Sequence, residues 1–215
     1  MAKKKAINKA AKVRVAKKAA TNATTTKKTP SKPIVGTKRS FFVLTRQDRS
    51  DLANVEDIDE DGFDDSPLYD GTPFDGKFPK GFRVWLDGGK PCDLLGGAQN
   101  WLIVSDRFVK ATEELLRGQV KVFDIPVFDS ETQKPVRGYK LLHVLSSLKT
   151  AATVNGKLMI HFSWGIVLEG NRIPTSTHIF RMKEAKTYIA VSSEVRKACK
   201  AAGCIGLEYL AVSIV

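Results

Sequence analysis

Two stretches of the chain repeat one order of apolar and polar positions. Residues 101–128 and 188–212 each open with an apolar run that ends in Val-Ser, at Ser105 and Ser192. A serine hydroxyl accepts a hydrogen bond from the first turn of a helix, and the acidic residue that follows is favoured by the helix dipole. Apolar residues then recur at helical spacing, a glycine follows, and a second apolar run comes after it. The pattern predicts two strand–helix–strand units, related by duplication or sharing only a common cap.

The remaining apolar runs are short and are typical of strands. Residues 41–45 and 82–86 are rich in β-branched and aromatic side chains, so we expect a strand at each. The run at 139–148 fits a strand or a short helix, because a brief apolar run does not distinguish the two. We predict an α+β fold, in which a mixed sheet and the two strand–helix–strand units pack as one domain over residues 41–215.

The charge of the chain is unevenly distributed. The formal net charge is +12, but residues 1–40 hold 13 of the 35 basic residues and none of the 23 acidic ones. The rest of the chain therefore carries 22 basic and 23 acidic residues, a net charge of −1. Residues 1–40 contain almost no large apolar side chain, so they cannot offset the entropy of ordering and we predict a disordered basic tail.

The basic tail suggests a weak, salt-sensitive contact with nucleic acid, because lysine and arginine neutralise phosphates. The residues that would make this contact are Lys3, Lys4, Lys5, Lys12, Arg14, Lys17 and Lys18. A solvated tail with no specific role explains the same composition.

An acidic segment lies within the folded part. Residues 48–75 hold eleven acidic residues against the single Arg49, and their glycines and prolines predict a loop. Such a segment can meet a basic patch of a partner protein, or the chain's own tail. We take Asp57, Asp59, Asp61, Asp64 and Asp65 as candidate partner-binding residues.

The spacing of the same carboxylates also resembles a calcium loop. Alternate acidic residues from Asp57, with Gly62 at the sixth position, follow the pattern of an EF-hand loop. The twelfth position, however, is Leu68, where that loop needs a bidentate glutamate. A weak calcium site and a solvated acidic segment both remain open.

Signatures of catalysis and of cofactor binding are missing from the sequence. No phosphate-binding glycine loop and no Gly-x-Ser-x-Gly elbow occurs, and the three histidines form no ligand motif. The three cysteines cannot all pair internally, which favours reduced thiols. No apolar run reaches the roughly 18 residues of a membrane span. We therefore expect a cytoplasmic, non-enzymatic protein that needs no cofactor and no membrane.

Three blocks of the folded part resemble a known family. They are WLIVSDRFVKATEEL (101–115), RGYKLLHVL (137–145) and STHIFRMKEAKTYIAVSSEVRKACKAAGCIGLEY (176–209). Together they resemble the eleventh named immunity family of bacterial polymorphic toxin systems, long described as a domain of unknown function. The sequence departs from the family pattern at His143, Ile205 and Tyr209, where we expect Asn, Thr and Phe. The resemblance covers residues 41–212 and leaves out the basic tail.

The resemblance implies a protein that binds and neutralises a cognate toxin without catalysis. It does not identify the toxin. Arg181 belongs to the Ile-Phe-Arg-Met block, so it could anchor the partner, or it could form a structural salt bridge.

Overall fold

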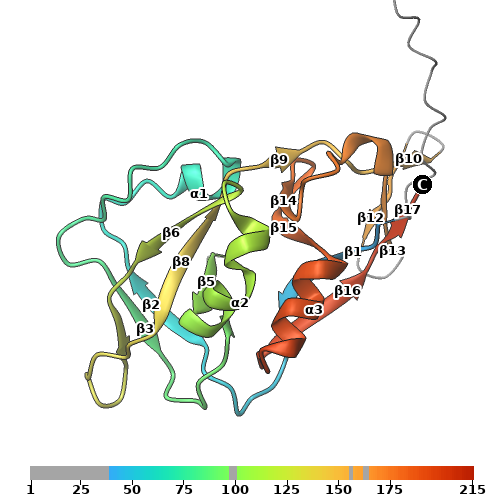
Figure 1. Ribbon diagram of the computed structural model, residues 1–215. Coiled ribbons are helices and arrows are strands. Elements are labelled where there is room, and N and C mark those ends of the chain that lie inside the picture. The colour runs from blue at the N-terminus through green and yellow to red at the C-terminus, as the bar shows by residue number, and fades with distance from the viewer. Residues whose placement is uncertain (1–38, 97–100, 155–156, 162–164) are drawn as a thin grey trace, which may run out of the picture. The chain divides into compact units, whose positions relative to one another are not determined.

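The computed structural model describes residues 39–215 apart from 97–100, 155–156 and 162–164 (Figure 1). Helices and strands are both present, and the α+β fold class is confirmed. The prediction of a disordered tail falls on residues 1–38, which lie outside the described residues. Arg39 and Ser40, which we had counted with the tail, contact the folded part. The Ser40 carbonyl accepts a hydrogen bond from the Ser193 amide at 2.9 Å.

The first strand–helix–strand unit forms as predicted. It consists of β5 (Leu102–Ser105), α2 (Asp106–Leu116) and β6 (Val120–Asp124). The Ser105 hydroxyl caps α2 by accepting from the Phe108 amide at 3.1 Å, as the pattern predicted. Strands β5 and β6 do not pair directly. Both lie antiparallel to β8 (Tyr139–Val144), which is inserted between them. The segment 139–148, which could have been a strand or a short helix, therefore contains β8 and a second, two-residue strand at Ser147–Leu148, and no helix.

The second unit has the same arrangement. It consists of β15 (Ala185–Ser192), α3 (Ser193–Ala201) and β16 (Leu207–Ala211), and Ser192 caps α3 by accepting from the Val195 amide at 3.4 Å. Strand β1 (Phe41–Arg46) lies between β15 and β16 and is antiparallel to both. The two units therefore reproduce one architecture, whether or not duplication produced it.

The strands are distributed over several sheets rather than one. The order β4-β5-β8-β6 includes β4 (Leu94–Leu95), and the order β16-β1-β15-β14-β9 includes β14 (Ile179–Met182) and β9 (Ser147–Leu148). A third sheet joins β2 (Val55–Asp59), β3 (Arg83–Leu86) and β7 (Val127–Asp129). A fourth joins β12 (Ile160–His161), β13 (Gly165–Leu168) and β17 (Ser213–Ile214). The pair β10 (Thr153–Val154) and β11 (Lys157–Leu158) lies on either side of residues 155–156, and a short 3-10 helix covers Gly170–Arg172.

One apolar cluster joins the two units. Helices α2 and α3 pack against each other. Phe108 of α2 and Val195 of α3, both at 0% exposure, share this cluster with Val104, Val144 and Val191 from the sheets. The capping serines place these helix residues inward, because each lies three positions after its cap. Burial of this shared face stabilises both units together.

The prediction of a loop over residues 48–75 is wrong in two places. Residues Val55–Asp59 form β2, and Ser66–Asp70 form the short helix α1. Val55 and Ile58 pair with Leu86 and Val84 of β3, so the strand turns its apolar residues inward and its carboxylates outward. The sequence pattern concealed the strand because the acidic residues outnumber the apolar ones.

Candidate partner-binding surface

Five carboxylates lie along one continuous segment. Asp57 and Asp59 are on β2, and Asp61, Asp64 and Asp65 follow on the turn into α1. All are exposed except Asp65, which is partly buried. We call these five residues the acidic surface.

The carboxylates of the acidic surface accept hydrogen bonds from neutral groups, which do not cancel their negative charge. Asp57 accepts from the Ile58 amide at 2.9 Å, and Asp64 accepts from the Ser66 amide at 3.1 Å. Asp59 accepts from the indole nitrogen of Trp85 on β3 at 2.8 Å. Within the described part of the chain, none of the five forms an ion pair with a lysine or an arginine. The surface therefore keeps a negative charge that its described neighbours do not neutralise.

The pKa of Glu60 reflects the negative charge of the acidic surface. Burial raises the pKa of the Glu60 carboxyl, and the negative charges of Asp65 and Asp57 raise it further. An extra negative charge is thus disfavoured at this place, and a positive charge from a partner would be favoured.

The carboxylates do not form the calcium loop that their spacing suggested. Gly62 has the left-handed backbone expected of the sixth position, with φ of 76°. Asp57 and Asp59, however, lie on a strand, where they cannot wrap around an ion with the turn residues. In the described ranges, no group of three His, Cys, Asp or Glu side chains is placed to hold a metal.

Aromatic rings lie beside the acidic surface, and the sequence analysis did not single them out. Phe63, Phe74 and Phe78 contact one another with ring centroids 5.4 to 5.7 Å apart. They line a shallow pocket of about 610 Å³ together with Asp64 and Asp75. Lys77 also lines the pocket and pairs with Asp75 at 2.8 Å, whereas Asp64 has no ion pair among the described residues. Aromatic rings beside such a carboxylate suit the apolar stem and charged end of a lysine or arginine.

Arg181 has neither of the roles considered for it. Its side chain is 1% exposed, so it does not reach a partner at the surface. It forms no ion pair within the described part of the structure. Its guanidinium donates to the Lys186 carbonyl at 2.7 Å and lies over the ring of Tyr69, 5.7 Å from its centroid. Burial lowers the pKa of Arg181 to about 10, although Tyr69 opposes the shift. Arg181 is a buried, structural cation.

Two histidines, His178 and His143, make contacts within the fold. The Nδ1 atom of His178 lies 2.9 Å from the Ser192 hydroxyl, but that hydroxyl is fully buried and caps α3. His143 is fully buried, and its Nε2 atom contacts the Thr72 carbonyl at 2.8 Å. Because a carbonyl only accepts, Nε2 carries the proton. Both contacts join segments of the fold: His178 to the cap of α3, and His143 to the loop that holds Thr72.

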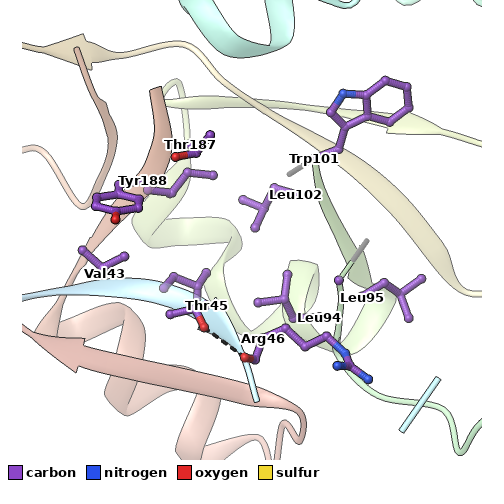
Figure 2. A pocket seen from close by; sticks show the side chains of 12 residues that line it. Val43, Thr45, Arg46, Leu94, Leu95, Trp101, Leu102, Thr187 and Tyr188 are labelled. Atoms are coloured by element: carbon purple, nitrogen blue, oxygen red, sulfur yellow. Dashed lines mark hydrogen bonds between the residues drawn. The ribbon is translucent and has the colours of Figure 1, made fainter. Parts of the chain in front are cut away.

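A second pocket, of about 520 Å³, lies between β1 and β15 on one side and β4 and β5 on the other (Figure 2). Its described lining residues include no carboxylate, histidine or cysteine. Thr45 donates to the carbonyl of Arg46, and the Arg46 guanidinium donates to the Leu52 carbonyl at 2.9 Å. Both side chains therefore bond to the backbone, and most of the other lining residues are aliphatic.

The lysines and arginine proposed for nucleic-acid contact all precede residue 39, so they lie outside the described residues. None of the described helices is long and apolar enough to cross a membrane. No protein-family model matches the chain, and no curated protein matches it. The resemblance to an immunity family therefore rests on the motif residues alone.

Proposed function

We propose that this protein is a non-catalytic, cytoplasmic immunity-type protein that binds and neutralises a cognate bacterial toxin. We further propose that the acidic surface receives a basic region of that toxin. The observation that carries the proposal is the set of five carboxylates, none of which forms an ion pair with a cation in the described part of the chain. The resemblance of the three motif blocks to an immunity family supplies the class of partner.

The acidic surface would act mainly on capture. A negative patch attracts a positive partner before contact, so it raises the association rate more than the lifetime of the complex. The aromatic pocket beside it offers an apolar floor for the stem of a basic side chain. Neutralisation would follow from covering or distorting the active site of the toxin.

Co-expression with the toxin-like proteins of neighbouring genes tests the proposal. We expect one of them to be toxic alone and to be rescued and co-purified by this protein. If this protein rescued cells from none of these toxins, the proposal would be refuted.

Charge variants then locate the interface. The triple variant Asp57→Asn, Asp61→Asn, Asp64→Asn should slow association about tenfold at about 50 mM salt, with much less effect at about 500 mM. The matched control Asp48→Asn, Glu131→Gln, Glu208→Gln removes the same charge from other exposed sites and should change the rate far less. Equal effects of the two triples would place the interface elsewhere while leaving the rescue result intact.

A nucleic-acid role is the second candidate, favoured by the 13 basic residues of the tail. DNA affinity would then depend steeply on salt. Replacing the seven candidate residues by glutamine in the full chain should reduce both the affinity and the salt slope. An unchanged slope would refute this second role.

A further inference from the structure

The two strand–helix–strand units can be compared residue by residue, because their strand registers agree. In the first unit Leu102, Leu142 and Val122 lie side by side across β5, β8 and β6. In the second unit Ile189, Leu44 and Tyr209 lie side by side across β15, β1 and β16. Leu102 and Ile189 each stand three residues before the capping serine. Val122 and Tyr209 are therefore equivalent positions on equivalent edge strands.

The edge strand β6 presents unpaired backbone groups. It is the last strand of its sheet and pairs only with β8. The Leu145 amide donates to the Gln119 carbonyl at 2.9 Å, so these two opposite residues form a hydrogen-bonded pair. In an antiparallel ladder, hydrogen-bonded pairs alternate with pairs that are not bonded to each other. Lys121 and Phe123 therefore bond to β8, and the N–H and C=O groups of Val120, Val122 and Asp124 point outward.

An open groove accompanies this edge. A pocket of about 240 Å³ lies between α2 and β6, and Val109, Leu116, Val120 and Val122 form its apolar walls. Val122 is 42% exposed, and it is one of only four large apolar side chains so exposed among the residues with described burial. The groove is thus apolar, accessible and adjacent to the free backbone.

The equivalent groove of the second unit is covered by the chain itself. The rings of Phe42 and Tyr209 meet edge to face at 6.3 Å. Arg196 of α3 lies over both rings, at 4.5 Å from Phe42 and 5.7 Å from Tyr209. The first unit has Val109 at the position of Arg196 and Val122 at that of Tyr209. The space that an aromatic ring fills in one unit is left empty in the other.

Charge along β6 favours a different protein over a second copy of this chain. Lys121 is exposed and has no ion pair in the described ranges, whereas Asp124 is paired with Lys140. In antiparallel pairing of β6 with a second β6, opposite residues share a face, so Lys121 would meet another Lys121 or an apolar residue. Pairing of β6 with β6 of a second copy therefore places no acidic residue opposite Lys121, so a partner segment with an acidic residue at that place suits this edge better.

We propose that β6 is a second docking edge, to which an extended segment of a partner protein adds as an antiparallel strand. The segment would place an aromatic side chain in the groove opposite Val122 and an acidic side chain opposite Lys121. Backbone hydrogen bonds would supply affinity and the groove would supply specificity.

A synthetic peptide tests this edge without knowledge of the partner. The probe is the capped peptide Thr-Lys-Thr-Phe-Glu-Val-Thr, whose Phe and Glu would face Val122 and Lys121. Titration into the full isotope-labelled chain, followed by NMR, should give saturable shifts centred on β6. Exchanging Phe for Ala in the peptide should weaken binding several-fold.

Proline variants separate strand addition from general stickiness. Val122→Pro removes an outward N–H without touching the ladder to β8, which edge strands tolerate. We expect this variant to bind the peptide about tenfold more weakly, because backbone hydrogen bonds to the peptide are lost. The matched control Ala211→Pro removes the outward N–H of the equivalent strand β16 and should leave binding unchanged. A third variant, Val109→Phe, fills the groove and should abolish the preference for Phe over Ala.

Binding of the peptide to the wild-type chain and to the two proline variants decides between the possible outcomes. Saturable binding that Val122→Pro weakens and Ala211→Pro does not supports the docking edge. No saturable binding to the wild-type chain, shifts centred on β16, or equal effects of the two proline variants would overturn it. Thermal unfolding of each variant confirms that the fold is intact, and Val109→Phe decides the question if Val122→Pro fails to fold.

Discussion

Asp93 links the two strand–helix–strand units, so we predict that its replacement lowers the free energy of unfolding of the protein. Its side chain is 3% exposed, and it precedes β4 in the first sheet. One carboxylate oxygen accepts from the Ser105 hydroxyl that caps α2, and the other accepts from the Ile205 amide after α3 at 2.7 Å. Arg107 lies 3.6 Å from the same carboxylate. A single buried anion therefore joins the start of one helix to the segment beyond the other.

The expected cost of Asp93→Ala follows from these bonds. A hydrogen bond to a charged group contributes about 1.5 to 3 kcal/mol, so the loss of two gives about 3 to 6 kcal/mol. The ion pair with Arg107 adds little, because the arginine is 56% exposed. Asp93→Asn can keep the bond to Ile205 and should cost about 1 to 2 kcal/mol.

Urea unfolding followed by tryptophan fluorescence measures both variants. The Asp93→Ala variant should unfold at a temperature about 10 °C lower in a parallel thermal scan. A double variant with Ser105→Ala should lose less than the sum of the single changes, because both delete one bond. A loss below about 1 kcal/mol for Asp93→Ala would refute the reasoning.

Four further expectations follow from three buried groups and the partly buried Cys204. Ser192→Ala should cost about 1 to 2 kcal/mol in urea unfolding, because the hydroxyl caps α3 and also contacts a histidine; an unchanged midpoint would contradict this. Arg181→Met should be neutral or stabilising while Arg181→Ala costs about 3 to 5 kcal/mol, because the guanidinium is buried without a carboxylate; equal losses would argue against it. Burial lowers the pKa of His143 below 6.5, so its contribution is complete above pH 6.5 and is lost as the pH falls, since the unfolded state binds the proton first. His143→Gln should therefore flatten the fall in unfolding free energy between neutral pH and about pH 5, and an equally steep fall would count against this. Burial raises the pKa of Cys204 to about 12, so iodoacetamide at about pH 8 should alkylate it slowly until urea unfolds the chain, and rapid alkylation of the native chain would show an accessible thiolate.

The candidate partner surface was only partly accessible to sequence reasoning. The five carboxylates could be named from composition, and the structure places them on one exposed segment. Their aromatic neighbours could not be assigned, because Phe63, Phe74 and Phe78 meet only when the chain folds over residues 63–78. The two roles considered for Arg181 were wrong for a related reason. The sequence does not show whether an arginine is buried, because burial is decided by the surrounding strands.

The sequence by itself determined the two strand–helix–strand units, because caps, helical periodicity and end-of-helix glycines are local signals within about 20 residues. It also determined the separation of a basic tail from a nearly neutral folded part. Only the tertiary structure decided that β8 and β1 are inserted between the strands of each unit, since strand pairing joins residues far apart in the chain. The same long-range packing decided that Tyr209 covers one groove while Val122 leaves the other open, because the neighbours of a side chain are fixed by register and not by sequence distance.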